Sequence, residues 1–389
     1  MKKKHFIFLI IALVLLVVLI TSFNYFKTTN TYIDDSVNNQ TKITKGISMN
    51  LEQTAGAGDY KTVTRSSWPT EGYKFNTELS RCENGGEINW DDINKKVIVT
   101  GNVSDKCYVY FDIWIPSIAA YCTSGTDLAT CVKNFGDQGP SVSNIYIHNS
   151  TLTNGAGDNS YRYAGANPNN YVCFGSEATT CPDANLFRII GVFGDQAKVI
   201  RAKSVGDQPW HTSQVNNWSS SSLNTYLNGT YLTSLGTLAE KIATTTWKVG
   251  GGDEANISFS VPATAYQYEV GSSASTTTVD KKIGLMYVSD YYYGASPSAW
   301  KLVGYNSSDA TKDYRAATST NWLYLGSTEW TISRNSGYTY LAFLVNSAGY
   351  VYYSGYVPVS LAVRPSFNLL SSVKYISGSG SMSDLVRIN

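Results

Sequence analysis

The chain has 389 residues, a formal net charge of +1 and only 15% charged side chains. So little charge excludes the strongly basic surface that a nucleic-acid partner would require. Aromatic residues reach 13%, and Gly, Ser, Thr and Asn dominate the polar set, which is typical of an exported, β-rich protein. The length allows about two globular domains besides any membrane segment.

The N-terminal residues predict a membrane anchor. A lysine-rich stretch, residues 1–5, precedes an uncharged apolar run at residues 6–23 that is just long enough to span a bilayer. The lysines place the N-terminus in the cytoplasm and the following domains outside the cell. A cleaved signal peptide is the alternative, but no clear small-x-small cleavage site follows the run. We therefore expect a single-pass protein of the cell membrane with an uncleaved signal anchor at 6–23.

The six cysteines fall into three pairs that are close in sequence. An even number in an exported chain indicates disulfides, and local pairing is the simplest of the 15 possible connectivities. There is no CxxC motif, and the histidines are scattered, so we expect no metal site and no cofactor. The predicted bonds are Cys82–Cys107, Cys122–Cys131 and Cys173–Cys181.

Residues 24–45 are polar and resemble a stalk. Residues 46–113 contain short strand candidates separated by turn signals, which predicts a small all-β module closed by Cys82–Cys107. Residues 114–160 form a connecting region with a short helix expected within Tyr121–Phe135. The strand candidates of the module are Tyr60–Thr64, Tyr73–Asn76, Glu87–Trp90, Lys96–Thr100 and Cys107–Asp112.

A second domain is expected at residues 161–389. Leu186–Phe193 and Ala197–Ala202 predict a hairpin, and the serines before Leu223 predict the start of a short helix. Lys282–Ser289 is expected to be a buried strand, and Val363–Phe367 the final core strand.

The sequence from Tyr340 to Ser354 predicts another hairpin, with its turn at Asn346–Gly349. Leu341, Phe343 and Val345 share one face, which we expect to be the core face. This hairpin and its flanks are unusually rich in Tyr, interleaved with Asn, Ser and Gly, the composition that binding loops use. The alternative is that these tyrosines merely suit strands.

Five motifs in order carry a resemblance to a family: LFRIIGVFGDQAKVIRA, SSLNTYLNGTYL, KIGLMYVSD, EWTISR and LAVRPSFNL. Their order and spacing are similar to those of exported surface proteins of Firmicutes-type bacteria, whose C-terminal domain resembles the C-type-lectin-like and formylglycine-generating-enzyme-like fold. The Tyr-rich hairpin also resembles the variable region of proteins diversified by retroelements. The resemblance implies an α+β, β-rich fold class: an N-terminal transmembrane helix, a small all-β module and a C-type-lectin-like domain.

The sequence lacks the motifs of several enzyme and lectin families. No cysteine follows Cys181, as a formylglycine-generating enzyme would need, and the calcium-lectin tripeptides EPN, QPD and WND are missing. There is no GxSxG, HExxH, P-loop or dinucleotide fingerprint, so we expect no enzyme. A wall-glycan hydrolase, the less favoured alternative, would need paired carboxylates in a cleft. Glu329 and Arg334 are expected to pair at the surface, and Arg364 to be a buried structural arginine.

The sequence thus predicts a ligand-binding surface protein, adhesin or receptor-like, with a structural surface protein as the alternative. Its partner would be a protein or glycan on another cell, a host or a phage. Tyr291–Tyr293 follow the expected strand 282–289 and would join the tyrosines of the hairpin from a strand end. The predicted ligand-binding residues are Tyr291, Tyr292, Tyr293, Tyr338, Tyr340, Asn346, Tyr350, Tyr352, Ser354 and Tyr356.

Overall fold

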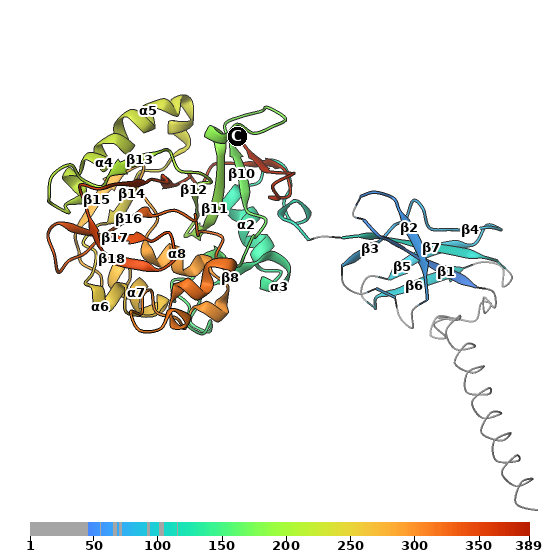
Figure 1. Cartoon of the computed structure of the whole chain (residues 1–389). Helices are drawn as coiled ribbons and strands as arrows, with labels where there is room; N and C mark the ends of the chain where they lie inside the picture. Colours follow the sequence, from blue (N-terminus) through green and yellow to red (C-terminus); the bar gives the residue numbers. More distant parts are fainter. Residues whose placement is uncertain are drawn as a thin grey trace, which may run out of the picture. The chain divides into compact units, whose positions relative to one another are not determined.

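The computed structural model describes residues 46–54, 56–64, 68–69, 72–91, 94–100, 105–114 and 116–389 (Figure 1). Contacts divide the chain into two compact units, the first ending at Pro116 and the second comprising Ser117–Asn389. The second unit therefore includes most of the stretch 114–160, which the sequence suggested was a connecting region. The described part of each unit is presented separately below.

The first unit is built on a sheet with strand order β2-β1-β7-β3, in which β4 also pairs with β7. Strand β1 was not predicted; it runs parallel to β7, and their buried residues Leu51, Val109 and Phe111 lie in the core of the unit. The predicted strands are confirmed to within a residue or two at their ends. The bounds are β1 Ile47–Glu52, β2 Tyr60–Val63, β3 Tyr73–Phe75, β4 Arg81–Cys82, β5 Glu87–Asp91, β6 Lys96–Thr100 and β7 Cys107–Ile113.

The first sheet of the second unit has the order β20-β12-β11-β10-β22-β21, with β9 on β11 and β8 on β9. Its central strand β11 is buried almost throughout, is apolar except for Arg188, and packs against α2. The predicted hairpin β11–β12 is confirmed. The bounds are β8 Ile145–Ile147, β9 Tyr161–Tyr163, β10 Tyr171–Phe174, β11 Leu186–Phe193, β12 Gln196–Arg201, β20 Ser366–Asn368, β21 Tyr375–Ser377 and β22 Val386–Ile388.

The second sheet of this unit has the order β13-β19-β16-β17-β18, and β14 pairs with β15 alone. Leu341, Phe343 and Val345 of β17 are buried, as predicted, and so are Ala342 and Leu344, because β17 lies inside the sheet. Strand β18 is one edge of this sheet, and β13 is the other. The bounds are β13 Asp207–Pro209, β14 Thr245–Lys248, β15 Thr278–Lys281, β16 Glu329–Arg334, β17 Leu341–Val345, β18 Val351–Tyr356 and β19 Ser360–Ala362.

Short helices surround these sheets. The α-helices are α2 Leu128–Gly136, α3 Pro140–Ser143, α4 Ser222–Tyr226, α5 Leu232–Ser234, α6 Glu254–Ile257, α7 Pro262–Glu269 and α8 Val288–Gly294. One π-helical turn, Leu227–Tyr231, joins α4 to α5. The 3₁₀ turns are Ile118–Ala120, Asp183–Asn185, Trp218–Ser220, Gly236–Lys241, Pro297–Ala299, Ala310–Lys312 and Tyr314–Thr320.

The prediction of a buried strand at residues 282–289 is wrong. The chain is extended there with only one bridge, from Gly284 to Ser366, and α8 begins at Val288. The Asp290 carboxylate accepts a hydrogen bond from the Tyr287 N–H at 2.8 Å, which caps the helix. A short apolar run does not by itself distinguish a buried strand from a buried helix, and here the cap decides.

The fold class expected from the sequence also needs correction. Within the described residues, no helix is long and apolar enough to cross a membrane. The segment 6–23, for which a transmembrane helix was predicted, lies outside the described residues. So do the lysine-rich residues 1–5 and the predicted stalk, residues 24–45. The fold that is described consists of the two β-rich units with short helices.

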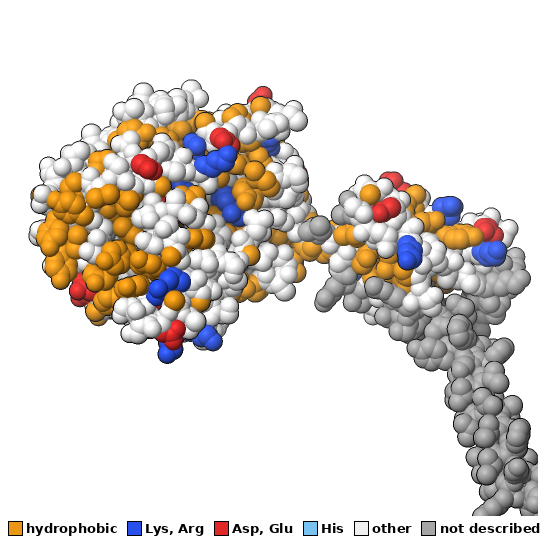
Figure 2. Space-filling model, viewed as in Figure 1, with side chains coloured by type: hydrophobic (Ala, Val, Ile, Leu, Met, Phe, Trp, Pro, Cys, Tyr) orange, Lys and Arg blue, Asp and Glu red, His pale blue; other side chains and the backbone are white. Residues whose placement is uncertain are grey.

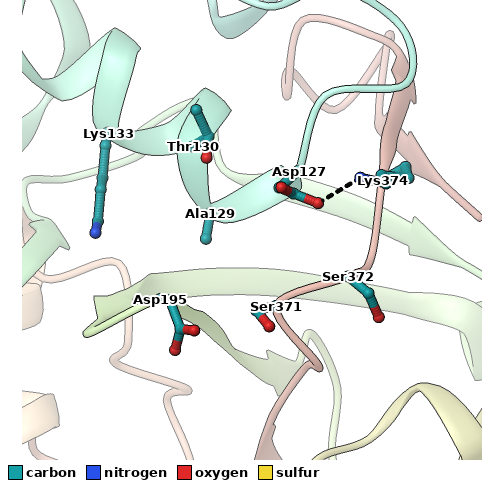
Figure 3. A pocket seen from close by; sticks show the side chains of 8 residues that line it. All are labelled: Asp127, Ala129, Thr130, Lys133, Asp195, Ser371, Ser372 and Lys374. Carbon is teal, nitrogen blue, oxygen red and sulfur yellow. Dashed lines mark hydrogen bonds and ion pairs between the residues drawn. The ribbon is translucent and has the colours of Figure 1, made fainter.

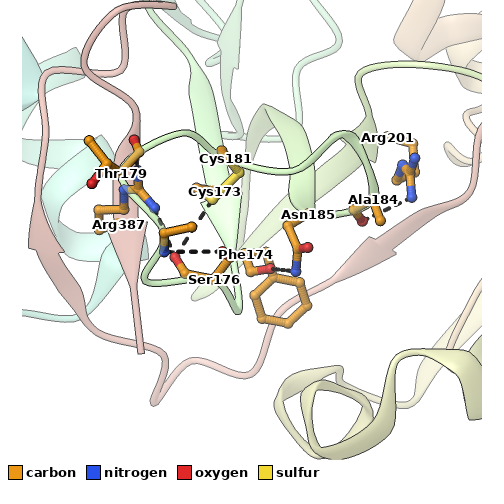
Figure 4. Close-up of a disulfide and its surroundings, with 10 residues drawn as sticks. Cys173, Phe174, Ser176, Thr179, Cys181, Ala184, Asn185, Arg201 and Arg387 are labelled. Atoms are coloured by element: carbon orange, nitrogen blue, oxygen red, sulfur yellow. Dashed lines mark hydrogen bonds between the residues drawn. A yellow bond between two sulfur atoms is a disulfide. The ribbon is translucent and has the colours of Figure 1, made fainter.

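The three predicted disulfides are confirmed: Cys82–Cys107, Cys122–Cys131 and Cys173–Cys181. Figure 4 shows the third one closing the loop after β10. Arg387 of β22 donates hydrogen bonds to the carbonyl oxygens of Ser176 and Thr179 at 2.8 and 3.1 Å. The loop is thus held by the disulfide at its base and by an arginine along its length.

Candidate functional site

Aromatic side chains gather on the second unit beside the edge strand β18. Figure 2 shows hydrophobic side chains spread over the face formed by β17, β18 and α6. Four of the rings are more than a third exposed: Phe259 at 43%, Tyr338 and Tyr340 at 41%, and Tyr356 at 38%. We call the set the aromatic surface: Phe259, Tyr305, Tyr338, Tyr340, Tyr350, Tyr352, Tyr353 and Tyr356.

The rings around Tyr305 contact one another in series. Tyr305 lies 4.8 Å from Tyr350 and 5.9 Å from Tyr352 between ring centroids. Tyr352 lies 5.1 Å from Tyr353, which in turn lies 5.2 Å from Phe259. Such spacings are favourable for aromatic pairs, so these five side chains form one continuous surface.

The remaining rings extend this surface toward the loop before β17. Tyr340 lies 6.1 Å from Tyr338 and 6.3 Å from Tyr356 between centroids. Tyr356 lies on β18 together with Tyr352 and Tyr353, so one strand carries members of both groups of rings. Of the predicted residues, Tyr338, Tyr340 and Tyr356 thus form one group of contacting rings, and Tyr350 and Tyr352 belong to the other.

One arginine borders the surface. The Arg315 guanidinium lies 5.5 and 5.3 Å from the ring centroids of Tyr305 and Tyr350, within the range of a cation–π interaction. Its Nε and Nη2 donate to the Asp313 carboxylate at 2.9 and 2.6 Å, and these hydrogen bonds raise the pKa of Arg315. The arginine is thus fixed in direction, with its charge balanced by a buried aspartate.

Tyr291, Tyr292 and Tyr293 do not belong to this surface, and the prediction that they would be exposed is wrong. They are 0–1% exposed because α8 is buried on all sides. The Tyr291 hydroxyl donates to the carbonyl oxygen of Gly349 at 2.6 Å, and that of Tyr292 to Ile257 at 2.8 Å. Burial raises the pKa of both tyrosines well above the usual value. Tyr291 therefore supports the turn of the hairpin from beneath.

A buried asparagine fixes the loop that carries Tyr338 and Tyr340. Asn216 is 2% exposed, and its Nδ2, which has two N–H groups to donate, lies 2.6–2.7 Å from the carbonyl oxygens of Asn335, Tyr338 and Leu341. Three carbonyls that converge on one amide hold the loop in a single conformation. The rings are thus presented on a preorganised backbone, which reduces the entropy lost on binding.

The backbone of β18 is partly occupied. The Val351 N–H donates to the Gly304 carbonyl at 3.0 Å, and the Tyr353 carbonyl accepts from Asn335 Nδ2 at 3.1 Å. A partner strand would have to displace these bonds to extend the sheet. The side chains of β18, not its edge, are therefore the groups available for binding.

The other predicted site residues have varied environments. Asn346 Oδ1 accepts from the Ala348 N–H at 2.9 Å, so this side chain shapes the turn. Ser354 is half-buried on β18. Sequence reasoning missed Phe259 and Tyr305, because both are distant in sequence from the hairpin and no local pattern links them to it.

The expected surface pair of Glu329 and Arg334 is also wrong. Glu329 is fully buried and its carboxylate accepts from Arg364 at 2.7 and 2.8 Å. Burial raises the pKa of Glu329, while Arg364 opposes that rise. Arg364 is 3% exposed, which confirms its expected structural role, and Arg334 donates to the Gly250 carbonyl at 2.8 Å.

A cavity of about 190 Å³ lies elsewhere in this unit, and we call it the polar pocket. At its base, Lys198 Nζ lies 2.5 Å from Asp290, and Arg162 contacts Asp158 at 2.6 Å and Asp290 at 3.6 Å. Burial lowers the pKa of Lys198, with Asp290 opposing. Burial raises the pKa of Asp158, but Arg162 and Ser160 outweigh it and lower this pKa to about 2. Asp158 is thus held ionised and unsuited to act as a general acid.

A larger, open hollow of about 410 Å³ lies between α2 and the chain before β21 (Figure 3). Its Asp127–Lys374 ion pair, at 2.6 Å, is about 40% exposed on both sides. Except for that ion pair, the side chains drawn in Figure 3 do not contact one another. A backbone bridge between Asp127 and Lys374 ties the chain before β21 to the residue before α2.

Within the described residues, one cluster has metal-ligand character: Cys82, Asp105 and Cys107. Both cysteines are in a disulfide, and the Asp105 carboxylate accepts from the N–H groups of Asn84 and Gly86 at 2.8 and 3.0 Å. These groups are thus already engaged in the closure of the first unit.

No family model, curated protein or solved structure matches the chain.

Proposed function

We propose that the chain is an exported, extracellular protein that binds a macromolecular partner through the aromatic surface, as an adhesin or receptor does. The observation that carries the proposal is the presence of two groups of contacting rings, with four rings more than a third exposed, on and beside one hairpin. Three disulfides support an oxidising compartment. Aromatic side chains and arginine are the residues that most often contribute the strongest contacts of an interface.

The alternative, a structural surface protein whose tyrosines merely suit strands, fits the aromatic surface less well. Here Asn216 and Tyr291 reach from other segments to hold the backbone that carries the rings. Several adjoining exposed rings also form the kind of patch that marks interaction sites.

The geometry favours a protein as the partner. The rings of Tyr350 and Tyr352 are inclined by 89°, and those of Tyr340 and Tyr356 by 72°. Such a surface is uneven and carries hydroxyl groups between the rings, which suits the mixed polar and apolar contacts of a protein interface. A flat platform of coplanar rings, on which successive sugar rings would stack, is not formed by these pairs.

Binding of the labelled full chain to a panel of intact bacterial and epithelial cells tests this proposal. The variant combines Tyr350→Ala, Tyr352→Ala and Tyr356→Ala, and the matched control combines Leu370→Ala, Ile376→Ala and Met382→Ala, which are exposed apolar residues outside the aromatic surface. Since aromatic anchors contribute about 2 kcal/mol or more each, we expect the variant to bind at least about tenfold more weakly. The control should bind like the wild type.

Treatment of the cells identifies the class of partner. Loss of binding after protease treatment, with no loss after periodate oxidation of glycans, supports a protein partner. The reverse result assigns a glycan partner and contradicts the protein assignment. If the tyrosine variant binds as well as the control, or if no cell in the panel binds the wild type, the structural alternative holds.

A further inference from the structure

We propose that the polar pocket binds one neutral, hydroxyl-bearing small molecule, about the size of a single sugar ring. The pocket shares no residue with the aromatic surface, so the inference does not depend on the proposed function. Its volume of about 190 Å³ is below the range of about 300–1,000 Å³ that drug-sized ligands occupy. The residues that line it are Asp158, Arg162, Phe193, Lys198, Thr245, Thr246, Trp247, Tyr266, Val270, Tyr287, Ser289, Asp290 and Asn368.

The walls of the pocket include aromatic rings whose polar atoms are used elsewhere. Trp247 Nε1 donates to the Lys281 carbonyl at 3.0 Å. The Tyr287 hydroxyl donates to the Lys248 carbonyl at 3.1 Å and accepts from the Lys248 N–H at 2.9 Å. The Lys198 ammonium lies 5.4 and 4.8 Å from the centroids of these two rings. Both residues therefore offer the pocket ring surface and no polar atom.

Two polar side chains lie next to each other at the base. Lys198 of β12 and Asn368 of β20 are direct cross-strand partners, so their side chains project from the same face of the sheet. Asn368 Nδ2 donates to Thr245 Oγ1 at 3.1 Å, whereas its Oδ1 is buried and has no hydrogen-bond partner. Such a buried acceptor costs free energy until a donor reaches it.

Lys198 supplies the complementary group. An ammonium has three N–H donors, and among the described residues Asp290 is the only hydrogen-bond acceptor that Lys198 Nζ reaches. Residues with unused donors and with an unused acceptor, Lys198 and Asn368, thus both belong to the lining of the pocket. Each hydroxyl of a ligand both donates and accepts, and two adjacent hydroxyls satisfy Asn368 Oδ1 and Lys198 Nζ together.

The balance of charge in the pocket favours a neutral ligand. Arg162 and Lys198 are already paired with Asp158 and Asp290 in a nearly buried cluster. A charged ligand would either separate these pairs or bring an uncompensated charge into the pocket, and both are costly. A neutral sugar brings hydroxyls for the polar base and C–H faces for Trp247 and Tyr287.

Ligand-observed NMR and calorimetry on the full chain test the proposal. The probes are glucose, galactose, mannose and N-acetylglucosamine, with glucuronate as a charged sugar of similar size. We expect at least one neutral sugar to bind and glucuronate to bind more weakly. Two variants should each reduce that affinity at least about tenfold: Asn368→Leu, which removes the acceptor, and Val270→Trp, which fills the pocket away from the ion pairs.

The matched control is the triple alanine variant of Tyr350, Tyr352 and Tyr356, which should keep sugar binding while its cell binding is weakened. Circular dichroism verifies that each variant is folded. The proposal is overturned if no neutral sugar binds the wild type, if glucuronate binds best, or if a folded Asn368→Leu or Val270→Trp variant retains full affinity. None of these results alters the test of the aromatic surface.

Discussion

Two tyrosine-rich segments of the second unit have opposite roles. In α8, Tyr291–Tyr293 are buried, and their hydroxyls donate to the carbonyls of Gly349, Ile257 and Asn154. On and beside the edge strand β18, the rings of Tyr350, Tyr352 and Tyr356 reach solvent. Among the described residues, no hydrogen bond is made by the hydroxyls of these three.

The difference shows that tyrosine content alone does not predict a binding surface. A buried tyrosine needs a partner for its hydroxyl, and a helix packed on all sides supplies carbonyls from neighbouring segments. On the edge strand β18, residues 352–354 are half-buried and Tyr356 is exposed, so tyrosine hydroxyls there stay available to a ligand. The surrounding element, not the residue type, decides which role a tyrosine takes.

The largest effect is expected where the buried segment is truncated. Tyr292→Ala removes a fully buried ring and its bond to the Ile257 carbonyl, so we expect the free energy of unfolding to fall by about 3–5 kcal/mol. Tyr352→Ala, on the exposed segment, should lower it by less than about 1 kcal/mol. Urea denaturation of each variant with the disulfides intact measures both values.

A conservative change at the same position serves as the control. Tyr292→Phe keeps the ring and removes only the hydroxyl, so its cost should be that of one buried hydrogen bond, about 1–3 kcal/mol. Equal destabilisation by Tyr292→Ala and Tyr352→Ala would contradict the division into a structural and a binding segment.

An intermediate loss of unfolding free energy is expected at Asn216, a buried residue that supports the loop of the aromatic surface. Asn216→Ala removes the amide on which three loop carbonyls converge, although the Leu341 carbonyl still accepts from the Asn335 N–H, and should cost about 1–3 kcal/mol. It should also weaken cell binding, although Asn216 is itself buried, because the loop that carries Tyr338 loses its fixed conformation. Hydrogen exchange over residues 335–341 measures the loosening.

The neighbouring asparagine provides the matched control for this variant. Asn217 is exposed and its side chain accepts one hydrogen bond, from the Ser219 N–H at 3.1 Å. Asn217→Ala should leave exchange in the loop and cell binding unchanged. If Asn216→Ala behaves the same way, the loop is fixed by something other than the asparagine.

The sequence predicted those features that local patterns determine. Period-two alternation gave the strands β17 and β18 and the core face of Leu341, Phe343 and Val345. Spacing along the chain gave the three disulfides. Part of the aromatic surface followed, because Tyr338, Tyr340, Tyr350, Tyr352 and Tyr356 lie within or beside one hairpin.

The features that the sequence did not predict depend on contacts between distant segments. The stretch 282–289 has no period that separates strand from helix, and the cap by Asp290 was not recognised. Phe259 and Tyr305 reach the aromatic surface only through the tertiary fold. The polar pocket combines residues from 158 to 368, and its cross-strand pair Lys198–Asn368 requires knowledge of which strands are neighbours.

The smallest effect concerns a histidine that packs against the buried segment. His148 is fully buried, and its ring lies 4.5 Å from that of Tyr293 between centroids. Its Nδ1 accepts from the Ala156 N–H at 3.1 Å. Burial, with Arg162 adding to it and Asp158 opposing, lowers the pKa of His148 from 6.5 to about 2. The histidine thus stays neutral in the folded protein where it would be protonated in the unfolded chain.

A depressed pKa on a base makes folding sensitive to acid. The unfolded chain binds a proton below pH 6.5 that the folded state rejects until about pH 2. The contribution of His148 to the free energy of unfolding is therefore constant above about pH 6.5. Below that pH it falls by about 1.4 kcal/mol per pH unit. His148→Gln cannot titrate, so the difference in unfolding free energy between the two proteins should change by about 1.4 kcal/mol between pH 7.5 and pH 5.5. Shifts at other groups cancel in this difference, and parallel pH curves would show that His148 is protonated, or exposed, in the folded state.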